Sequence, residues 1–158
     1  MKLPKSLGTV AFWLTWPALW IYLKNSKRTR VIITYRGEVL LIKAWLGTSD
    51  WALPGGGRHR NETAEAAGIR EVMEETGIDI NTCEKRELFT DRAINELGFS
   101  FTHSCYVAEL QKKPKTALQR SEVVKAIWAS QKQLQSLKLS KASKACLEAW
   151  SDSLDLIH

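Results

Sequence analysis

The most regular pattern of polar and apolar positions lies between residues 61 and 77, and it has the period of an α-helix. At about 100° per residue, Glu71, Glu74 and Glu75 share an arc of roughly 100° on one face. The opposite face carries apolar side chains, namely Ala66, Ile69, Val72 and Met73. The pattern therefore predicts a helix that packs with one face and gathers negative charge on the other.

The ends of this helix are marked by residues that favour capping positions. Gly77 stands where a left-handed C-terminal cap belongs, because glycine adopts positive φ without a steric penalty. At the other end, Asn61 or Thr63 can accept a hydrogen bond from the first turn. We therefore expect the helix to begin soon after residue 61 and to end before Gly77.

Short runs of apolar and β-branched residues predict strands before and after the helix. Residues 31–35 and 39–43 flank residues 36–38 and predict a hairpin. The run 99–110 alternates, and it places His103 on the apolar-leaning face, where we interpret it as a hydrogen-bonded core histidine rather than a catalytic base. Further strands are expected at residues 51–54, 85–92 and 122–128, and helices from residue 131 and over residues 140–153. Residues 91–98 are expected to form a connecting loop, which is a candidate border of the substrate site. Strands and helices in this order predict an α/β protein.

An uncharged, tryptophan-rich and mostly apolar run occupies residues 7–23 between basic flanks. It is at the short end for a membrane span, which usually needs about 20 residues, and Pro17 would kink a helix there or start a shorter one. Three arrangements stay open: association with a membrane, packing on the domain or on a second subunit, and cleavage as a signal peptide. We divide the chain into this hydrophobic N-terminal segment, residues 1–29, and a folded domain, residues 30–158.

The net charge of +6 is confined to the N-terminal part of the chain. Residues 1–30 contain six basic residues and no acid, whereas the other 17 basic residues match the 17 acidic ones. The body is about neutral, which argues against a broad nucleic-acid surface. The denser basic flank after the apolar run indicates a cytoplasmic protein, or one held at the cytoplasmic face of a membrane. The widely spaced Cys83, Cys105 and Cys146 form no disulfide framework, which indicates a reducing compartment.

Clustered carboxylates on one helix face need a counter-charge, because like charges at i, i+3 and i+4 destabilise a helix. Arg70 can supply part of it through Glu74. Oxygen ligands of this kind suit a hard divalent cation such as Mg²⁺, which keeps several of its waters. The alternative at this point is a solvated acidic face without a ligand.

The spacing over residues 56–78 resembles the Nudix box, Gly-x5-Glu-x7-Arg-Glu-U-x-Glu-Glu-x-Gly-U, where U is aliphatic. The lead-in at residues 51–57 also resembles the W-x-L-P-G-G sequence of that family, and weaker similarity extends over residues 31–136. The box is complete, through Gly56, Glu62, Arg70, Glu71, Val72, Glu74, Glu75, Gly77 and Ile78. This resemblance implies a Nudix hydrolase and its fold, an α/β/α sandwich with a mixed β-sheet.

The resemblance implies a Mg²⁺ site, with Mn²⁺ as a substitute, formed by Gly56 through its carbonyl and by Glu71, Glu74 and Glu75. The metal would neutralise a diphosphate and lower the pKa of a bound water, whose proton a carboxylate takes. Glu122 resembles an acid that some relatives use near a late strand as a ligand or general base. Whether Glu74, Glu75 or Glu122 is the base stays open.

Other residues of the box are expected to position the site. Arg70 is expected to orient its neighbours by pairing with Glu62 or Glu74, as in the family. Arg58, His59 and Arg60 precede the helix, and they are interpreted either as contacts to substrate phosphate or as a solvated basic loop.

The expected reaction is hydrolysis of the diphosphate bond in a nucleoside diphosphate linked to another moiety. Two alternatives stay open: a membrane-associated hydrolase of a lipid-linked diphosphate, and a Nudix-fold binding module without turnover. The family resemblance also implies that the domain can form a homodimer. No signature after the box specifies the substrate, and Glu74→Gln is expected to lower turnover by orders of magnitude.

Overall fold

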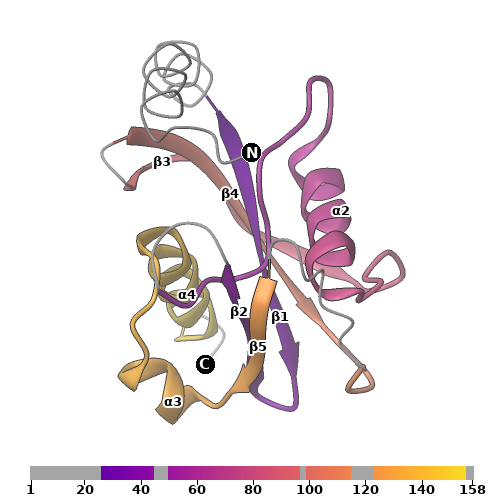
Figure 1. Cartoon of the computed structure of the whole chain (residues 1–158), viewed down its shortest axis with the longest axis vertical. Helices are drawn as coiled ribbons and strands as arrows, with labels where there is room; N and C mark the ends of the chain where they lie inside the picture. Colours follow the sequence, from indigo (N-terminus) through magenta and orange to yellow (C-terminus); the bar gives the residue numbers. More distant parts are fainter. Residues whose placement is uncertain (1–25, 45–49, 97–98, 115–122, 156–158) are drawn as a thin grey trace, which may run out of the picture.

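The computed structural model describes residues 26–44, 50–96, 99–114 and 123–155. Its centre is a five-stranded sheet in the order β3-β4-β1-β2-β5 (Figure 1). β1 runs parallel to β4 and the other neighbours are antiparallel, so the sheet is mixed, as predicted. The strands are β1 (Lys27–Tyr35), β2 (Glu38–Ala44), β3 (Lys85–Glu96), β4 (Phe99–Glu109) and β5 (Val123–Ala129).

Helices cover both faces of this sheet and complete three layers (Figure 1). α2 (Ala64–Thr76) lies on one face. α4 (Lys141–Asp155) lies on the other, with the short α3 (Gln131–Ser136) beside it. The predicted α/β/α sandwich is therefore confirmed, and so are the two C-terminal helices.

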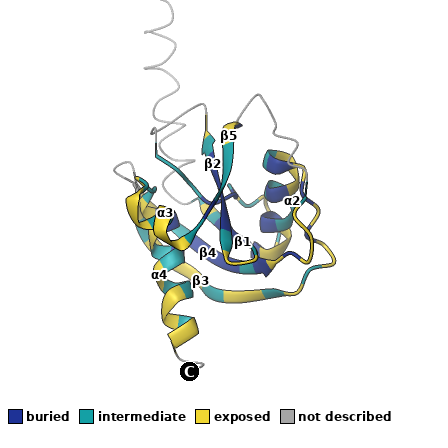
Figure 2. Cartoon of the chain, turned by 90° about the horizontal axis from the view of Figure 1, so that it is seen from below, coloured by how far each residue is buried: buried dark blue, intermediate teal, exposed yellow. Residues whose placement is uncertain are grey.

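The central strands bury both of their faces, which explains their continuous apolar sequence (Figure 2). Successive residues of β1 enter different cores, because side chains alternate along a strand. Val31 packs in the core that α2 completes with Val72, and Ile32 packs in the core that α4 completes with Cys146. Each such fully buried aliphatic side chain contributes about 1.5–3 kcal/mol to folding. The two cores together fix both helices against the sheet.

The turn between β1 and β2 confirms the predicted hairpin. Arg36 and Gly37 occupy it with φ values of 48° and 77°. Positive φ at both central positions matches the right-handed twist of the flanking strands. Glycine adopts positive φ without a steric penalty, so Gly37 is the residue that predicts a turn within residues 36–38.

The predicted loop at residues 91–98 is wrong over its first part, because β3 continues to Glu96. Register shifts between Glu87 and Phe89 and between Phe89 and Arg92 mark irregularities in its pairing with β4. Asp91 lies within the second of them and has a φ of 49°. A bulge of this kind redirects a side chain while the strand pairing resumes beyond it.

The predicted strand at residues 51–54 is also wrong in detail. Trp51 and Ala52 form only isolated bridges, to Leu139 and Ile42. Ala52 and Ile42 exchange backbone hydrogen bonds at 2.8 and 2.9 Å. These bridges lead the chain back across the sheet toward the glycine loop.

His103 is fully buried in β4, as predicted, but the expectation that it is hydrogen-bonded is wrong. Among the described residues, neither ring nitrogen has a hydrogen-bond partner. The charged neighbours Arg28 and Arg30 offer only donors. Burial, aided by these two cations, lowers the pKa of His103 to about 3. The ring is therefore neutral near neutral pH.

Several predictions concern residues outside the described ranges. They include the apolar run 7–23 and Glu122, which is the residue before β5. Among the helices of the described part, none is long and apolar enough to cross a membrane. Cys105 and Cys146 are buried free thiols, and Cys83 is a half-buried one.

Candidate active site

The helix that carries the predicted site, α2, has the caps that its sequence favours. The Thr63 hydroxyl accepts a hydrogen bond from the Ala66 backbone N–H at 3.1 Å. Gly77 has a φ of 69° and donates its N–H to the Met73 carbonyl at 2.9 Å. Of the two predicted N-caps, Thr63 holds the position, and Asn61 lies in the preceding loop with a φ of 66°. The caps fix where the helix begins and ends.

The glycine loop before α2 is held against β1 by backbone hydrogen bonds. Thr29 N–H donates to the Gly56 carbonyl at 2.9 Å, and Arg58 N–H donates to the Lys27 carbonyl at 2.9 Å. Gly55 packs against β1 with a φ of 136°, and a Cβ there would stand 2.1 Å from the Thr29 carbonyl oxygen. Only glycine permits this close approach. The loop is thus a fixed wall of the site.

Two glutamates of α2 reach this wall. Glu75 accepts a hydrogen bond from Gly55 N–H at 2.8 Å. A Cβ at Gly56 would lie 2.6 Å from both carboxylate oxygens of Glu71, so this carboxylate rests against the Gly56 backbone. We call Gly55, Gly56, Glu71 and Glu75 the oxygen cradle, because carboxylate oxygens rest there against the glycine backbone.

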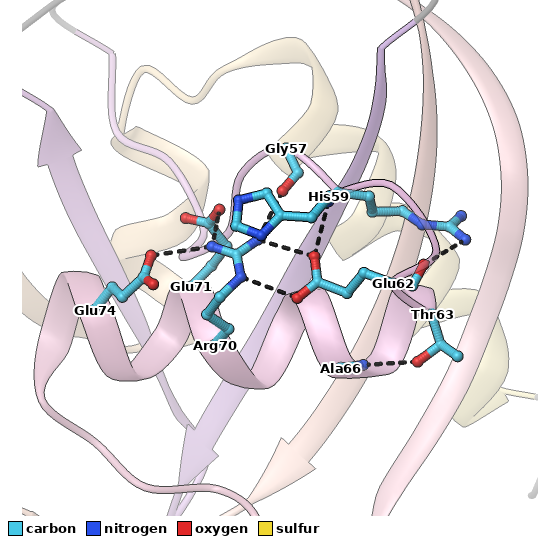
Figure 3. Close-up of polar contacts among 9 residues, drawn as sticks. Gly57, His59, Glu62, Thr63, Ala66, Arg70, Glu71 and Glu74 are labelled. Carbon is cyan, nitrogen blue, oxygen red and sulfur yellow. Dashed lines mark hydrogen bonds and ion pairs between the residues drawn. The ribbon is translucent and has the colours of Figure 1, made fainter.

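Arg70 lies at the centre of the polar network on α2, with Glu62, Glu71 and Glu74 around it (Figure 3). It donates to both oxygens of Glu62, at 2.9 and 3.1 Å. One terminal nitrogen also donates to Glu71 at 2.8 Å and to Glu74 at 3.0 Å, and the other donates to the Gly57 carbonyl at 2.9 Å. The rigid guanidinium fork makes these bonds together. Both predicted partners of Arg70 are thus observed.

These bonds settle the charge state of the central pair. The hydrogen bond from Arg70 lowers the pKa of Glu62 to about 2, against the effect of burial, which raises it. The backbone N–H of His59 assists by donating to the same carboxylate at 2.9 Å. The hydrogen bond to Glu62 in turn raises the pKa of Arg70. The pair is therefore ionised throughout the physiological range.

The three glutamates predicted to hold metal have different surroundings. The side chain of Glu71 is 14% exposed and that of Glu74 is 49% exposed. Glu74 bonds to Arg70, whereas Glu75 bonds to the glycine loop. In the described ranges, no three Asp, Glu, His or Cys side chains converge closely enough to form a metal-binding group.

The chemistry of the oxygen cradle nevertheless fits a hard divalent cation. Its candidate side-chain ligands are the carboxylates of Glu71 and Glu75, and its candidate backbone ligand is the Gly56 carbonyl. Ions such as Mg²⁺ prefer oxygen ligands of these kinds. The Gly56 carbonyl already accepts one hydrogen bond, from Thr29, and a carbonyl oxygen has a second lone pair.

The basic residues predicted to contact phosphate lie in the loop between Gly57 and α2. Arg58 is largely covered, with 17% of its side chain exposed, and it lies 3.5 Å from the Asp91 carboxylate. His59 and Arg60 are exposed. The structure thus brings Arg58 into contact with β3 and leaves its two neighbours on the surface.

Sequence reasoning missed the contact between two residues beside this loop. Asp91 was assigned to a connecting loop that was a candidate border of the substrate site, and Lys27 was counted only toward the N-terminal charge. The structure places the Lys27 ammonium 3.5 Å from the Asp91 carboxylate. A β-bulge is a product of strand pairing, so the local sequence around Asp91 carries little signal for it. β1 begins at Lys27, four residues before the predicted strand 31–35. Residues 27–30 are all polar, so no apolar pattern marks them as part of a strand.

The α/β/α sandwich, with a glycine loop packed against a glutamate-bearing helix, agrees with the family that the sequence resembles. The sequence model of the NUDIX domain matches residues 25–150 of the chain. The chain therefore belongs to the NUDIX family. This confirms the family and the enzyme class expected from the sequence, a hydrolase acting on phosphoanhydride bonds.

Individual relatives are similar to different extents. A stretch of 52 residues is 44% identical to mRNA-decapping enzyme subunit 2 of Arabidopsis thaliana, but it covers 33% of this chain and only 14% of that protein. The MutT NUDIX hydrolase from Burkholderia pseudomallei is similar in structure, with a TM-score of 0.65 and 23% identity, over 79% of this chain and 97% of that one.

A third relative was crystallised with ligands. It is the bifunctional NMN adenylyltransferase/ADP ribose pyrophosphatase from Francisella tularensis, in complex with AMP and a manganese ion. The TM-score is 0.73 and the identity 16%, over 90% of this chain and 46% of that one. At such identities the two solved structures show a shared fold.

Proposed function

We propose that this chain is a Mg²⁺-dependent hydrolase that cleaves the diphosphate bond of a nucleoside diphosphate linked to another moiety. The observation that carries the proposal is the oxygen cradle, in which the Glu71 carboxylate rests against Gly56 and Glu75 accepts a bond from Gly55. Mn²⁺ is expected to substitute for Mg²⁺. The manganese and AMP bound by the Francisella relative support this choice of cation and substrate class.

The residues of α2 and of the glycine loop have different roles in the proposed reaction. Glu71, Glu75 and the Gly56 carbonyl are the groups that would hold the ion, with Glu74 at their exposed side. When bound, such an ion neutralises the diphosphate and lowers the pKa of a coordinated water. A carboxylate accepts the proton of the water that attacks phosphorus. Arg70 keeps the carboxylates in place through the bonds described above.

The proposal is tested by Mg²⁺-dependent turnover across a panel of nucleoside diphosphate derivatives, with the Glu71→Gln variant. The amide keeps the shape of the side chain but removes the charge from the cradle. We expect kcat to fall by about 10²–10⁴-fold, the range that a positioned catalytic carboxylate typically supplies. Glu74→Gln and Glu75→Gln measure the other two carboxylates in the same assay.

Glu65→Gln is the matched control, because Glu65 lies on the first turn of the same helix with half of its side chain exposed. It is expected to keep wild-type turnover. Thermal unfolding of each variant checks that the fold is intact. Full activity of Glu71→Gln, or wild-type turnover that is insensitive to EDTA, would remove the assignment.

A further inference from the structure

A cleft of about 440 Å³ opens between the start of β1 and the loop before α2. Its wall is strongly basic for its size. Lys27 comes from β1, and Arg58, His59 and Arg60 come from the loop. The cradle and the cleft share one extended stretch of backbone. Since two residues of extended chain span about 7 Å, Gly56 and Arg58 present adjoining surfaces.

The acidic residue in this wall, Glu62, does not cancel the positive charge of the cleft. Its oxygens already accept hydrogen bonds from Arg70 and from the His59 backbone. Among the described residues, the Glu62 carboxylate forms its ion pair with Arg70 and not with Lys27, Arg58 or Arg60. Arg58 contacts Glu62 through the backbone instead, by donating to the Glu62 carbonyl at 3.3 Å.

Asp91 supplies an anion to two cations of this cleft, but it binds them loosely. Its two carboxylate oxygens lie 3.5 Å from Lys27 and 3.5 Å from Arg58, and its side chain is 49% exposed. Charge-assisted hydrogen bonds are normally 2.7–2.9 Å long, so both contacts are well beyond the optimum. The cleft thus holds two cations whose charges are only loosely paired.

Resting on the proposed function, we propose that this cleft binds a phosphoryl group beyond the scissile diphosphate, so that the preferred substrate carries a chain of three or more phosphates. Lys27, Arg58 and Arg60 are the contacts to that group. Asp91 is a positioning residue, which keeps Lys27 and Arg58 turned into the cleft when no substrate is bound. A phosphoryl group offers more oxygens and more charge than one carboxylate, and it therefore displaces Asp91 from both cations.

The arrangement predicts variants of opposite sign. Removing the Asp91 charge frees the two cations, so Asp91→Asn should tighten anion binding. Asparagine also tolerates the left-handed backbone found at this position. Removing a cation in Lys27→Gln should weaken binding. Glu38→Gln is the matched control, because it removes a part-exposed carboxylate from a surface ion pair with Lys113.

Calorimetry of the full chain with inorganic tripolyphosphate, in EDTA, measures the cleft without turnover. We expect Asp91→Asn to lower Kd about 3–10-fold and Lys27→Gln to raise it by a similar factor, as expected for single charge contacts near a surface. Glu38→Gln should match wild type. Inorganic orthophosphate should bind more weakly than tripolyphosphate. If Asp91→Asn and Lys27→Gln shift Kd in the same direction, or if neither shifts it, the proposal is wrong.

Turnover provides the second arm. The wild-type kcat/KM should be higher for a dinucleoside tetraphosphate than for the matching dinucleoside diphosphate, and Lys27→Gln should narrow that ratio. Equal kcat/KM values for the two substrates would overturn the inference and leave the proposed function standing. Tripolyphosphate binding with the expected variant pattern but no Mg²⁺-dependent turnover of either substrate would support the anion site and overturn the proposed function.

Discussion

Two groups of ion pairs flank the loop between Gly57 and α2, and they are built differently. On the helix side, Arg70 holds Glu62 through two bonds of 2.9 and 3.1 Å, and 15% of the Glu62 side chain is exposed. On the β3 side, Asp91 approaches Lys27 and Arg58 at 3.5 Å, with half of its side chain exposed. The first group is short and shielded, whereas the second is long and hydrated.

The difference in geometry corresponds to a difference in use. A bidentate pair shielded from water orients its partners, and Arg70 thereby positions Glu71 beside the glycine loop. An exposed pair near 3.5 Å is worth little, because water and salt screen it. The charges of Lys27 and Arg58 therefore stay available to a ligand. The loop thus separates a group that holds the site together from one that can exchange its partner.

The largest effect is expected on the helix side, from Arg70→Lys. One ammonium cannot replace a fork that reaches Glu62, Glu71, Glu74 and the Gly57 carbonyl at once. We expect a loss of about 1.5–3 kcal/mol in the free energy of unfolding, the range for hydrogen bonds to charged groups. We also expect lower kcat, because Glu71 loses its support. Urea unfolding and steady-state turnover measure the two effects.

Arg86→Lys is the matched control for that variant. Arg86 lies on β3, outside the box, and makes an exposed hydrogen bond to Ser153. It should change the free energy of unfolding by less than about 0.5 kcal/mol, as usual for a surface position. Equal effects of Arg70→Lys and Arg86→Lys would break the contrast between the two groups.

The helix side could be predicted from sequence because its signals are local. The caps at Thr63 and Gly77, the 3.6-residue period and the i, i+4 pair of Arg70 and Glu74 all fall within one segment. Short-range geometry of this kind follows from the helix itself. The mixed sheet and its two helical layers were likewise predictable, from apolar runs and from the family resemblance.

The β3 side could not be predicted, because it depends on pairing between segments far apart in the chain. Asp91 reaches Arg58 and Lys27 only through the bulge in β3 and the register of β4 on β1. A polar run such as residues 91–96 has the composition of a loop, yet it pairs with β4. The unpartnered state of His103 has the same origin, since the residues across the sheet decide what a buried ring can contact.

A smaller effect is expected from Glu62→Gln, and it depends on pH. The pKa of Glu62 is about 2 in the folded protein against an ordinary 4.5, so its ionised form contributes stability above pH 4.5 that is lost as pH falls toward 2. At pH 7 we expect the variant to lose about 1–2 kcal/mol, after allowance for screening by solvent. Urea unfolding between pH 7 and pH 2 measures the difference.

That difference should shrink as the pH falls from 4.5 toward 2, because about half of the wild-type Glu62 side chains are protonated when the pH reaches their pKa. Glu65→Gln on the same helix serves as the control, since its carboxylate pairs with Lys85 only at 3.8 Å. A loss for Glu62→Gln that stayed constant over the whole range would mean that the shape of the side chain, rather than its charge, supports Arg70.

The smallest effect on folding is expected from Asp91→Asn, and it marks the other end of the comparison. The two ion pairs of Asp91 are exposed and long, so their loss should lower the free energy of unfolding by less than about 0.5 kcal/mol. Asparagine keeps the positive φ of 49°, so the bulge itself should persist. The same urea titration, repeated in 0.5 M NaCl, which screens exposed charges, should show an even smaller difference.

Glu38→Gln again provides the reference, because its partner Lys113 lies at 2.7 Å on an exposed surface. If Asp91→Asn cost more than about 1.5 kcal/mol, beyond the range of exposed ion pairs, Asp91 would be a structural partner like Glu62. Its cations would then be committed to the fold and unable to exchange Asp91 for a ligand. A small folding effect combined with tighter tripolyphosphate binding is the result that separates a displaceable ion pair from a structural one.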